Sequence, residues 1–331
     1  MKVEGTKGFH PDFKCIGMQY CTGATFTVDG ELELCENGLH FCELPIGVFT
    51  FYPPMDSRYA DVEARGEVIR DPDTDDDSGN WCAKACTNEL RVLSEKTADH
   101  VVQDSIHWMA VHWSVPIAME GTFKFPFNDI SLVSKERVYS QSCSDLAVGC
   151  FKGNCLDNMT GYVSVVMEPL SIARNRKNWG SIAISFAGES AAVCDGLCGI
   201  SVNLGVNSMA ITRGDYGIVR VASFGRGETH GSYSVAMSQH RSTMTVLHGD
   251  DSVAITDGSV IVHGEGCIVL LTFMDRHHTI QAVKGTRLIM HNPNELTTER
   301  LEFICGTNDW PADTEIAYSQ IYDNWRTKHE R

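Results

Sequence analysis

Between about residue 141 and residue 266, small, polar and apolar positions recur every nine residues. A clear unit is Gly205-Val-Asn-Ser-Met-Ala-Ile-Thr-Arg213, followed directly by Gly214-Asp-Tyr-Gly-Ile-Val-Arg-Val-Ala222. Each unit begins with a turn-forming stretch rich in Gly, Asn and Asp, residues that tolerate positive φ angles. Its fifth and seventh residues are apolar and flank a small sixth residue. This alternation is typical of a β-strand with one buried face.

A single strand and turn of nine residues cannot bury an apolar face alone, so the units are expected to stack on one another. We expect two nonapeptides per coil and two parallel sheets around a thin core. The register slips at Lys177 and at residues 223–230, where a protruding loop is expected, and it resumes after both slips. That return argues against the alternative, a β-sandwich with coincidental spacing. The expected core consists of fifth and seventh residues such as Ile182, Val202, Ile211, Val235 and Ile255.

One residue does not fit this orientation of the strands. Arg220 occupies a seventh position, where a charged side chain would enter the core. It marks either the edge of a coil or a locally wrong register. A calcium-bound β-roll has the same period, but the Gly-Gly-x-Gly-x-Asp turns that it needs are absent from the sequence.

The flanking regions have a different texture. Val102, Ile106, Met109 and Trp113 fall on one stripe of an α-helix, just ahead of the repeats, where a solenoid needs its open edge covered. Apolar runs at 267–273 and 279–283 are expected to be strands that close the far end, before a terminal amphipathic helix. The fold class predicted is therefore mostly β. It comprises an N-terminal α+β leader module (1–95), a capping helix and connector (96–140), a parallel β-solenoid (141–266) and a C-terminal cap with a terminal helix (267–331).

The fourth, sixth and eighth residues of each unit would face outward if the fifth and seventh face inward. They are Ser, Ala and Thr almost throughout, although the surface of a chain with a net charge of −16 should collect long charged side chains. A flat face of small residues lets another sheet approach closely at little cost in side-chain entropy. We therefore expect a homo-oligomer, with the chain's own flanking modules as the alternative cover. The candidate oligomer-face residues are Ser181, Ala183, Ser208, Ala210, Ser252 and Ala254.

Composition narrows the classes of function. Lys and Arg number 27 against 43 Asp and Glu, which disfavours general nucleic-acid binding. No apolar stretch reaches 18 residues and no secretory signal opens the chain, so neither a membrane span nor export is expected. The 13 cysteines lack the layout of a disulfide-rich secreted module. We expect a reducing, cytoplasmic location.

Cysteines and one histidine cluster in the leader module. Cys15, Cys21, Cys35, His40 and Cys42 contain no Cys-x-x-Cys pair, so buried structural cysteines are favoured over a zinc site. A thiol site at Cys35, His40 and Cys42 is a weaker alternative. The acidic turn at residues 71–79 departs from a calcium loop in the position of its glycine and its last ligand. We expect no catalytic residues, no metal and no cofactor.

Where the nine-residue register shifts, the coil is expected to be irregular. Basic residues occur at both register shifts, near Lys177 and within residues 223–230. Guanidinium and imidazolium groups are suited to binding phosphate oxygens. A small nucleotide-like ligand is therefore one expected partner, besides a host protein. The candidate ligand-binding residues are Arg174, Arg176, Lys177, Arg226 and His230.

Several short motifs of the leader module are similar to those of a known family. Lys7-Gly-Phe, Cys15-Ile-Gly-Met-Gln-Tyr20, Leu34-Cys-Glu-Asn-Gly-Leu-His-Phe-Cys-Glu43 and Phe51-Tyr52 resemble an uncharacterised family encoded by bacteriophages and prophages. Members of that family place this module ahead of Gly-Asp-Tyr-Gly-type nonapeptides, and Gly214-Asp-Tyr-Gly217 matches that type. The resemblance covers the leader well, the repeats in pattern and the last 60 residues poorly. It implies an architecture and a phage context, hence the cytoplasm of an infected cell, but no catalytic residues.

Two functions are expected from these observations, and a third is weaker. The leading one is a non-enzymatic, phage-associated accessory protein whose solenoid self-associates or presents a surface to a partner. The alternative is an anti-defence protein that sequesters a nucleotide-like signalling molecule. The weakest is a Cys/His-dependent enzyme in the N-terminal module.

Overall fold

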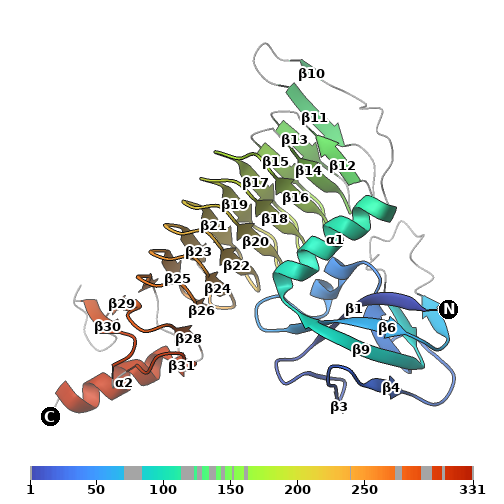
Figure 1. The fold of residues 1–331 in the computed structure, drawn as a ribbon, viewed down its shortest axis with the longest axis horizontal. Coiled ribbons are helices and arrows are strands. Elements are labelled where there is room, and N and C mark those ends of the chain that lie inside the picture. Colours follow the sequence, from blue (N-terminus) through green and yellow to red (C-terminus); the bar gives the residue numbers. More distant parts are fainter. Residues whose placement is uncertain are drawn as a thin grey trace.

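The computed structural model describes residues 2–70, 84–112, 123–124, 129–133, 139–142, 146–150, 153–159, 163–238, 240–272, 278–291, 300–307 and 310–329. The acidic turn at 71–79 and Trp113 lie outside them. A parallel β-solenoid of about seven turns occupies residues 147–289 and is joined to a small N-terminal β/α module and a C-terminal helix. Figure 1 shows the solenoid as a rod of stacked coils, with the N-terminal module against one side of it. None of the helices in the described ranges is both long and apolar enough to cross a bilayer.

The N-terminal module is built on an antiparallel seven-stranded sheet in the order β4-β9-β6-β1-β5-β8-β7, beside a small β2–β3 hairpin. Its core is a cluster of aromatic and aliphatic side chains around Phe9, Phe41 and Val62. The 3₁₀ helix η1 (Pro45–Thr50) and the helix α1 (Ala98–His112) cover the side that faces the solenoid. The strands are β1 (Val3–Phe9), β2 (Lys14–Cys15), β3 (Met18–Gln19), β4 (Thr25–Thr27), β5 (Leu39–Cys42), β6 (Arg58–Ala64), β7 (Val68–Arg70), β8 (Lys84–Thr87) and β9 (Glu89–Lys96).

Two sheets form the solenoid, and each coil contributes one four-residue strand to each of them. Pairing is parallel and in register from β11 to β29 in one sheet and from β12 to β28 in the other. We call the 12-stranded sheet the outer sheet. Its strands are β10 (Phe123–Lys124), β11 (Asp129–Val133), β13 (Leu146–Gly149), β15 (Val163–Val166), β17 (Ile182–Ser185), β19 (Ile200–Asn203), β21 (Ile218–Val221), β23 (Val235–Ser238), β25 (Val253–Thr256), β27 (Ile268–Leu271), β29 (Arg287–His291) and β30 (Arg300–Ile304).

The 10-stranded sheet is the one that the N-terminal module packs against, and we call it the docked sheet. Val101, Val102, Ile106 and Met109 of α1 join Ile211 and its neighbours on this sheet in one buried cluster. Its strands are β12 (Tyr139–Ser142), β14 (Cys155–Asn158), β16 (Ile172–Asn175), β18 (Ala191–Cys194), β20 (Met209–Thr212), β22 (Arg226–Thr229), β24 (Met244–Leu247), β26 (Ser259–Val262), β28 (Thr279–Ala282) and β31 (Ile316–Ala317).

The interior of the solenoid holds the small residues, which corrects the predicted orientation of the strands. Ala183, Ala210 and Ala254 are fully buried inside the coils, whereas Ile182 and Ile184 lie half-exposed on the outer sheet. Compact side chains such as Ala, Ser and Thr face this interior, and branched residues including Val219, Val221 and Leu247 pack beside them. Among the five residues expected in the core, only Ile211 is buried, and it packs against α1 outside the coil. The others, Val202, Val235, Ile255 and Ile182, are outward and half-exposed.

Several of the buried hydroxyl and amide groups of the interior bond across the thin core. Ser201 donates to the carbonyl oxygen of Ile211 on the opposite sheet at 2.6 Å, and Asn203 donates to the carbonyl oxygens of Ser190 and Met209 at 3.2 and 3.1 Å. A polar interior is stable only when its groups find such partners. The core is therefore held by side-chain hydrogen bonds as well as by packing.

The glycine at the first position of the repeat is required by close stacking of the coils. A Cβ atom on Gly205 would lie 1.8 Å from the carbonyl oxygen of Ala187 in the preceding coil, and one on Gly196 would lie 1.8 Å from that of Lys177. Positive φ occurs two residues later, as at Asn207 (52°) and Tyr216 (59°). Each of these turns therefore needs a glycine where two coils approach closely and a residue with positive φ two positions later.

The sequence predicted a protruding loop at residues 223–230, and this prediction was wrong. Arg226–Thr229 is the regular strand β22, paired in parallel with β20 and β24. The turn before it, residues 222–225, is one residue shorter than the preceding turn, 213–217, and the following one, 230–234. The two runs expected to close the far end are also regular coil strands, β27 and β28.

The C-terminal segment caps the solenoid. Trp310 and Tyr318 are fully buried, and Ile321 of the helix α2 (Tyr318–His329) packs with them on the last coil residues, including Leu288. Strands β30 and β31 pair antiparallel to β29 and β28 and so end the parallel ladders. Figure 1 shows this cap at the end of the rod away from β10.

Candidate functional site

A pocket of about 230 Å³ lies in the N-terminal module where β1, β5, β8, η1 and the β2–β3 hairpin meet. These segments are far apart in sequence, and the sheet order places β5 between β1 and β8. Its walls are largely apolar and aromatic, with two lysines and three cysteines among them. The residues that line it are Thr6, Lys7, Gly8, Cys15, Ile16, Cys35, His40, Phe41, Cys42, Val48, Phe51, Tyr52 and Lys84.

Lys7 is the most unusual residue of the pocket, because its side chain is buried without a carboxylate on it. It is only 3 % exposed. Its Nζ donates to the carbonyl oxygen of His40 at 2.7 Å and contacts Cys15 Sγ at 3.4 Å. The rings of Phe9 and Tyr20 lie 5.7 and 5.2 Å from the same atom, within the range of cation–π attraction. Burial lowers the pKa of Lys7, and the Cys15 thiol opposes that shift.

Cys15 lies between two hydrogen-bond donors. Besides Lys7, the phenol of Tyr52 donates to Cys15 Sγ at 3.0 Å. Burial, followed by the neighbouring Cys15, raises the pKa of Tyr52, so this phenol keeps its proton. Cys15 itself is 6 % exposed. Both donors would stabilise negative charge on the sulfur.

Cys35, His40 and Lys84 form the other side of the pocket. The Lys84 ammonium contacts Cys35 Sγ at 2.7 Å and lies 5.3 Å from the centre of the Phe51 ring. His40 Nε2 accepts from the backbone N–H of Cys35 at 3.0 Å, so the ring is neutral and carries its proton on Nδ1. Burial lowers the pKa of His40 to about 4, and the charges of Lys7 and Lys84 add to the shift. The ring therefore orders the Cys35 turn through the backbone amide of that residue, and a thiol site at Cys35, His40 and Cys42 stays a prediction.

A metal site at Cys15, Cys21, Cys35, His40 and Cys42 was not favoured by the sequence. In the described residues, only Glu228, His230 and His248 bring three ligand atoms close enough to share an ion. Cys42 is buried in the module and Cys21 is exposed.

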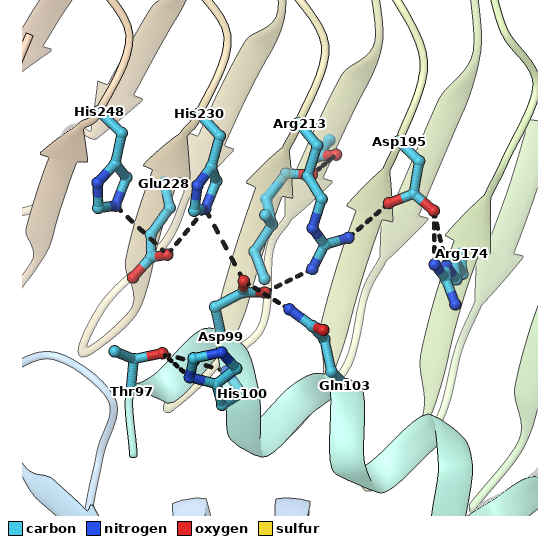
Figure 2. Close-up of polar contacts among 12 residues, drawn as sticks. Thr97, Asp99, His100, Gln103, Arg174, Asp195, Arg213, Glu228, His230 and His248 are labelled. Atoms are coloured by element: carbon cyan, nitrogen blue, oxygen red, sulfur yellow. Dashed lines mark hydrogen bonds and ion pairs between the residues drawn. The ribbon is translucent and has the colours of Figure 1, made fainter. Parts of the chain in front are cut away.

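The five ligand-binding residues predicted from the repeat slips belong to two coils of the docked sheet: Arg174 lies in β16, Arg176 and Lys177 follow it, Arg226 begins β22 and His230 follows that strand. Figure 2 shows a row of charged side chains from successive coils, Arg174 and His230 among them, above α1 in the view. Arg174 pairs with Asp195 at 2.7 Å and Arg176 with Asp157 at 2.5 Å. Lys177 lies in the turn after β16, where its backbone N–H donates to the side-chain oxygen of Asn175. Because carboxylates of the chain hold the two guanidinium groups, we do not place a phosphate site there.

Arg226 and His230 belong to a second group, which lies around strand β22. Arg226 Nε contacts Glu228 Oε1 at 2.5 Å, and His230 Nε2 lies 3.3 Å from Glu228 Oε2. Burial alone would raise the pKa of Glu228, but Arg226 and His230 hold it at about 2. His248 follows one coil later, with its ring stacked on that of His230 at 4.4 Å between centroids. Burial, with the neighbouring His230, lowers the pKa of His248 to about 4.

The six residues predicted to form an oligomer face lie inside the solenoid. Ser181, Ala183, Ser208, Ala210, Ser252 and Ala254 are all fully buried within the single chain. They occupy inward-facing positions of the coils, in the same interior where Val219 and Leu247 pack. Self-association stays a prediction, and it would need another surface.

Comparison with known proteins found a family match for the N-terminal module, and the description of that family states no activity. Residues 3–104 match the model of a family described as "Domain of unknown function (DUF7666)". The match includes all the residues that line the pocket and ends within α1. No curated protein and no solved structure matches the chain.

The sequence pointed to several of these residues without indicating a pocket. Lys7, Cys15, Cys35, His40, Cys42 and Tyr52 all fall in the motifs that carry the family resemblance. Lys84 lies outside those motifs and reaches the site only through the pairing of β8 with β5. One feature of the sequence could have pointed to the pocket, namely a lysine, Lys7, within the segment Val3–Phe9, which begins and ends with apolar residues.

Proposed function

We propose that this protein binds a small anionic ligand in the pocket of the N-terminal module, and that the solenoid is the scaffold that carries this module. The observation that supports the proposal is the buried amine of Lys7. Among the described residues that line the pocket, none is acidic, although the chain has a net charge of −16. A buried ammonium without a counter-charge is costly, so an anion that enters the pocket gains a strong interaction.

The walls indicate the rest of the ligand. Phe41, Phe51 and Tyr52 offer aromatic surface, and Lys84 adds a second amine to that of Lys7. Aromatic walls with cationic groups suit a flat ring that carries a phosphate or carboxylate group. A volume of about 230 Å³ accommodates one end of a nucleotide-like molecule rather than a dinucleotide.

The biological role proposed is sequestration of a nucleotide-like signalling molecule. It combines the pocket with the phage context that the family resemblance implies. The described pocket contains no triad of nucleophile, base and orienting group, which favours binding over turnover. In this role the protein acts by lowering the free concentration of its ligand.

Native mass spectrometry of the full chain purified from the expressing cells tests the proposal first. A retained small molecule of fixed mass is expected, and it should be absent from a Lys7→Met variant. Titration calorimetry with nucleoside monophosphates, cyclic nucleotides and ADP-ribose then identifies the class. Lys84→Met should weaken binding about tenfold through the loss of one charge-assisted contact.

A matched control separates this pocket from general electrostatics. Lys284→Met removes one exposed positive charge from the solenoid and should leave the affinity unchanged. Equal losses in Lys84→Met and Lys284→Met would contradict the proposal. So would a folded wild-type chain that binds none of these anions and retains none from the cell.

A second candidate function is a thiol-dependent reaction at Cys15. The observation that favours it is the position of Cys15 Sγ between Lys7 Nζ and the Tyr52 hydroxyl, on the wall of the pocket. Such donors stabilise a thiolate, the nucleophilic form of cysteine. Cys15 should then react with iodoacetamide faster than Cys155, whose pKa is raised by complete burial. Equal, slow labelling of both would remove this candidate.

A further inference from the structure

A group of two histidines and one glutamate lies at the edge of the docked sheet, where the first turn of α1 approaches the solenoid. Glu228 belongs to β22, His230 follows that strand, and His248 follows β24 one coil later. Figure 2 shows the three side chains pointing toward one another beside Asp99 of α1. We propose that Glu228, His230 and His248 bind a divalent transition-metal ion of the zinc class.

The distances among the three ligand atoms fit a shared ion after small rotations of the rings. Glu228 Oε2 lies 3.3 Å from His230 Nε2 and 3.9 Å from His248 Nε2. All three atoms lie within 4.8 Å of one another. Ligand atoms about 2.0 to 2.2 Å from a tetrahedral zinc ion are separated by roughly 3.3 to 3.6 Å.

The carboxylate is oriented before any ion arrives. Arg226 holds Glu228 Oε1, which leaves Oε2 turned toward the two imidazole rings. Glu228 is only 2 % exposed, so water competes little for this oxygen. An outer partner that fixes the orientation of a ligand in this way is typical of protein metal sites.

His230 provides the second, independent observation. Its Nε2 atom is buried and, despite the 3.3 Å separation from Glu228 Oε2, makes no hydrogen bond of acceptable geometry. This nitrogen lies close to the carboxylates of Glu228 and Asp99 without a well-aligned hydrogen bond, and it can give its lone pair to a metal ion placed among them. The atom faces the group formed by Glu228 and His248.

Two imidazole nitrogens and one carboxylate oxygen define the class of ion. This donor set suits zinc and other first-row divalent ions, and it disfavours calcium and magnesium, which prefer oxygen ligands. A fourth position is open toward Asp99, whose Oδ2 lies 3.9 Å from His230 Nε2. Gln103 donates to the same oxygen at 2.8 Å and holds it in place. An ion bound here would therefore connect two coils of the solenoid and approach α1.

The repeat geometry accounts for how the ligands meet. His230 and His248 are 18 residues apart, the length of one coil, so they occupy equivalent positions in adjacent coils. His263 continues the stack in the next coil, 5.0 Å from His248 between ring centroids, but it is outside the group of ligand atoms. It is the natural control residue.

Metal binding by the full chain, stripped with a chelator and titrated with Zn²⁺ against a chromophoric competitor, tests the proposal. We expect one tightly bound ion per chain. His248→Ala should weaken zinc binding by about 100-fold or more, because it removes a direct ligand, whereas removal of an outer partner costs about 10- to 100-fold. His263→Ala should leave the affinity within about threefold of the wild type. Because about a third of the His248 side chain (34 %) is exposed, the His248→Ala variant should fold, which circular dichroism checks.

Cobalt spectroscopy distinguishes this site from the thiols of the N-terminal pocket. Co²⁺ bound by nitrogen and oxygen ligands should give visible ligand-field bands without a sulfur-to-cobalt charge-transfer band in the near ultraviolet. A strong charge-transfer band lost in Cys35→Ser would place the ion in the pocket and overturn the proposal. Unchanged zinc affinity in His248→Ala and in His230→Ala, or no binding by the wild type, would overturn it as well.

Discussion

Asp99, in the first turn of α1, accepts a hydrogen bond from Arg213 of the solenoid at 2.5 Å, across 114 residues of sequence. Arg213 also contacts Asp195 at 2.5 Å, so one guanidinium group joins the helix to the row of charges on the docked sheet. Asp99 is only 7 % exposed, and it lies near the positive end of the helix dipole. The contact therefore fixes the N-terminal module on the rod at a defined coil.

Removing this carboxylate should loosen the module. Asp99→Asn leaves Arg213 with one counter-charge in a largely buried position, and we expect a loss of about 3 kcal/mol in the free energy of unfolding. Urea denaturation in the presence of a chelator measures it. Asp104→Asn, on the same helix but half-exposed, should change stability by about 0.5 kcal/mol or less. Equal effects of the two substitutions would show that the Asp99–Arg213 contact is not the attachment.

Two adjacent residues test which face of a strand is inside. Ala254 is fully buried in the coil, and Ile255 is half-exposed on the outer sheet. Ala254→Lys should prevent folding of the solenoid, because a charged side chain would enter a packed interior that offers it no counter-charge. Ile255→Lys should cost about 1 kcal/mol or less. Circular dichroism and thermal melting decide the question, and the opposite order of effects would restore the orientation expected from the sequence.

The glycine row should tolerate no side chain. Gly205→Ala would place a methyl group against the carbonyl oxygen of Ala187, and we expect a loss of about 3 kcal/mol as the coils are forced apart. Gly180→Ala is the matched control. Nothing lies within 4 Å of its Cβ position, so only the positive φ of 64° opposes it, at about 1 kcal/mol. Chemical denaturation measures both losses, and similar values would contradict close stacking as the reason for the glycine.

The pKa of His40 predicts a pH dependence of stability. The folded protein keeps this ring neutral down to about pH 4, whereas in the unfolded chain it takes up a proton near 6.5. The unfolded state therefore binds more protons between these values, and stability falls as the pH drops from 6.5 toward 4. His40→Gln should show a smaller decline over that window, measured by urea denaturation at pH 7 and at pH 4.5. A decline as steep as in the wild type would contradict the assignment to His40.

The period of the repeat was enough to predict parallel coils, but not which face of each strand is inside. Alternation is symmetrical, since both sets of positions repeat every second residue. Arg220 contained the missing information. Its side chain is exposed on the outer sheet, as a seventh residue must be if that position faces outward. Arg174 occupies the same position in its own unit and gives the same indication.

The candidate sites were predictable in part. The family motifs contain most of the pocket, but neither the motifs nor their spacing shows that β8 brings Lys84 beside Cys35. That contact depends on the order of strands in the sheet. His230 and His248 are 18 residues apart in the sequence, the length of two nonapeptides. If each coil contains two nonapeptides, this spacing predicts that the two histidines lie side by side in adjacent coils.

Because equivalent coils are stacked, the length of the solenoid can change by whole coils. A duplicated 18-residue segment beyond β24 would add one rung to each sheet and lengthen the rod by about 4.8 Å. The N-terminal module would stay on its own coils, since its contacts end near β22, and the terminal helix would still close the last coil. The distance between the ligand pocket and the far cap can therefore evolve in equal steps, independently of the chemistry at either end.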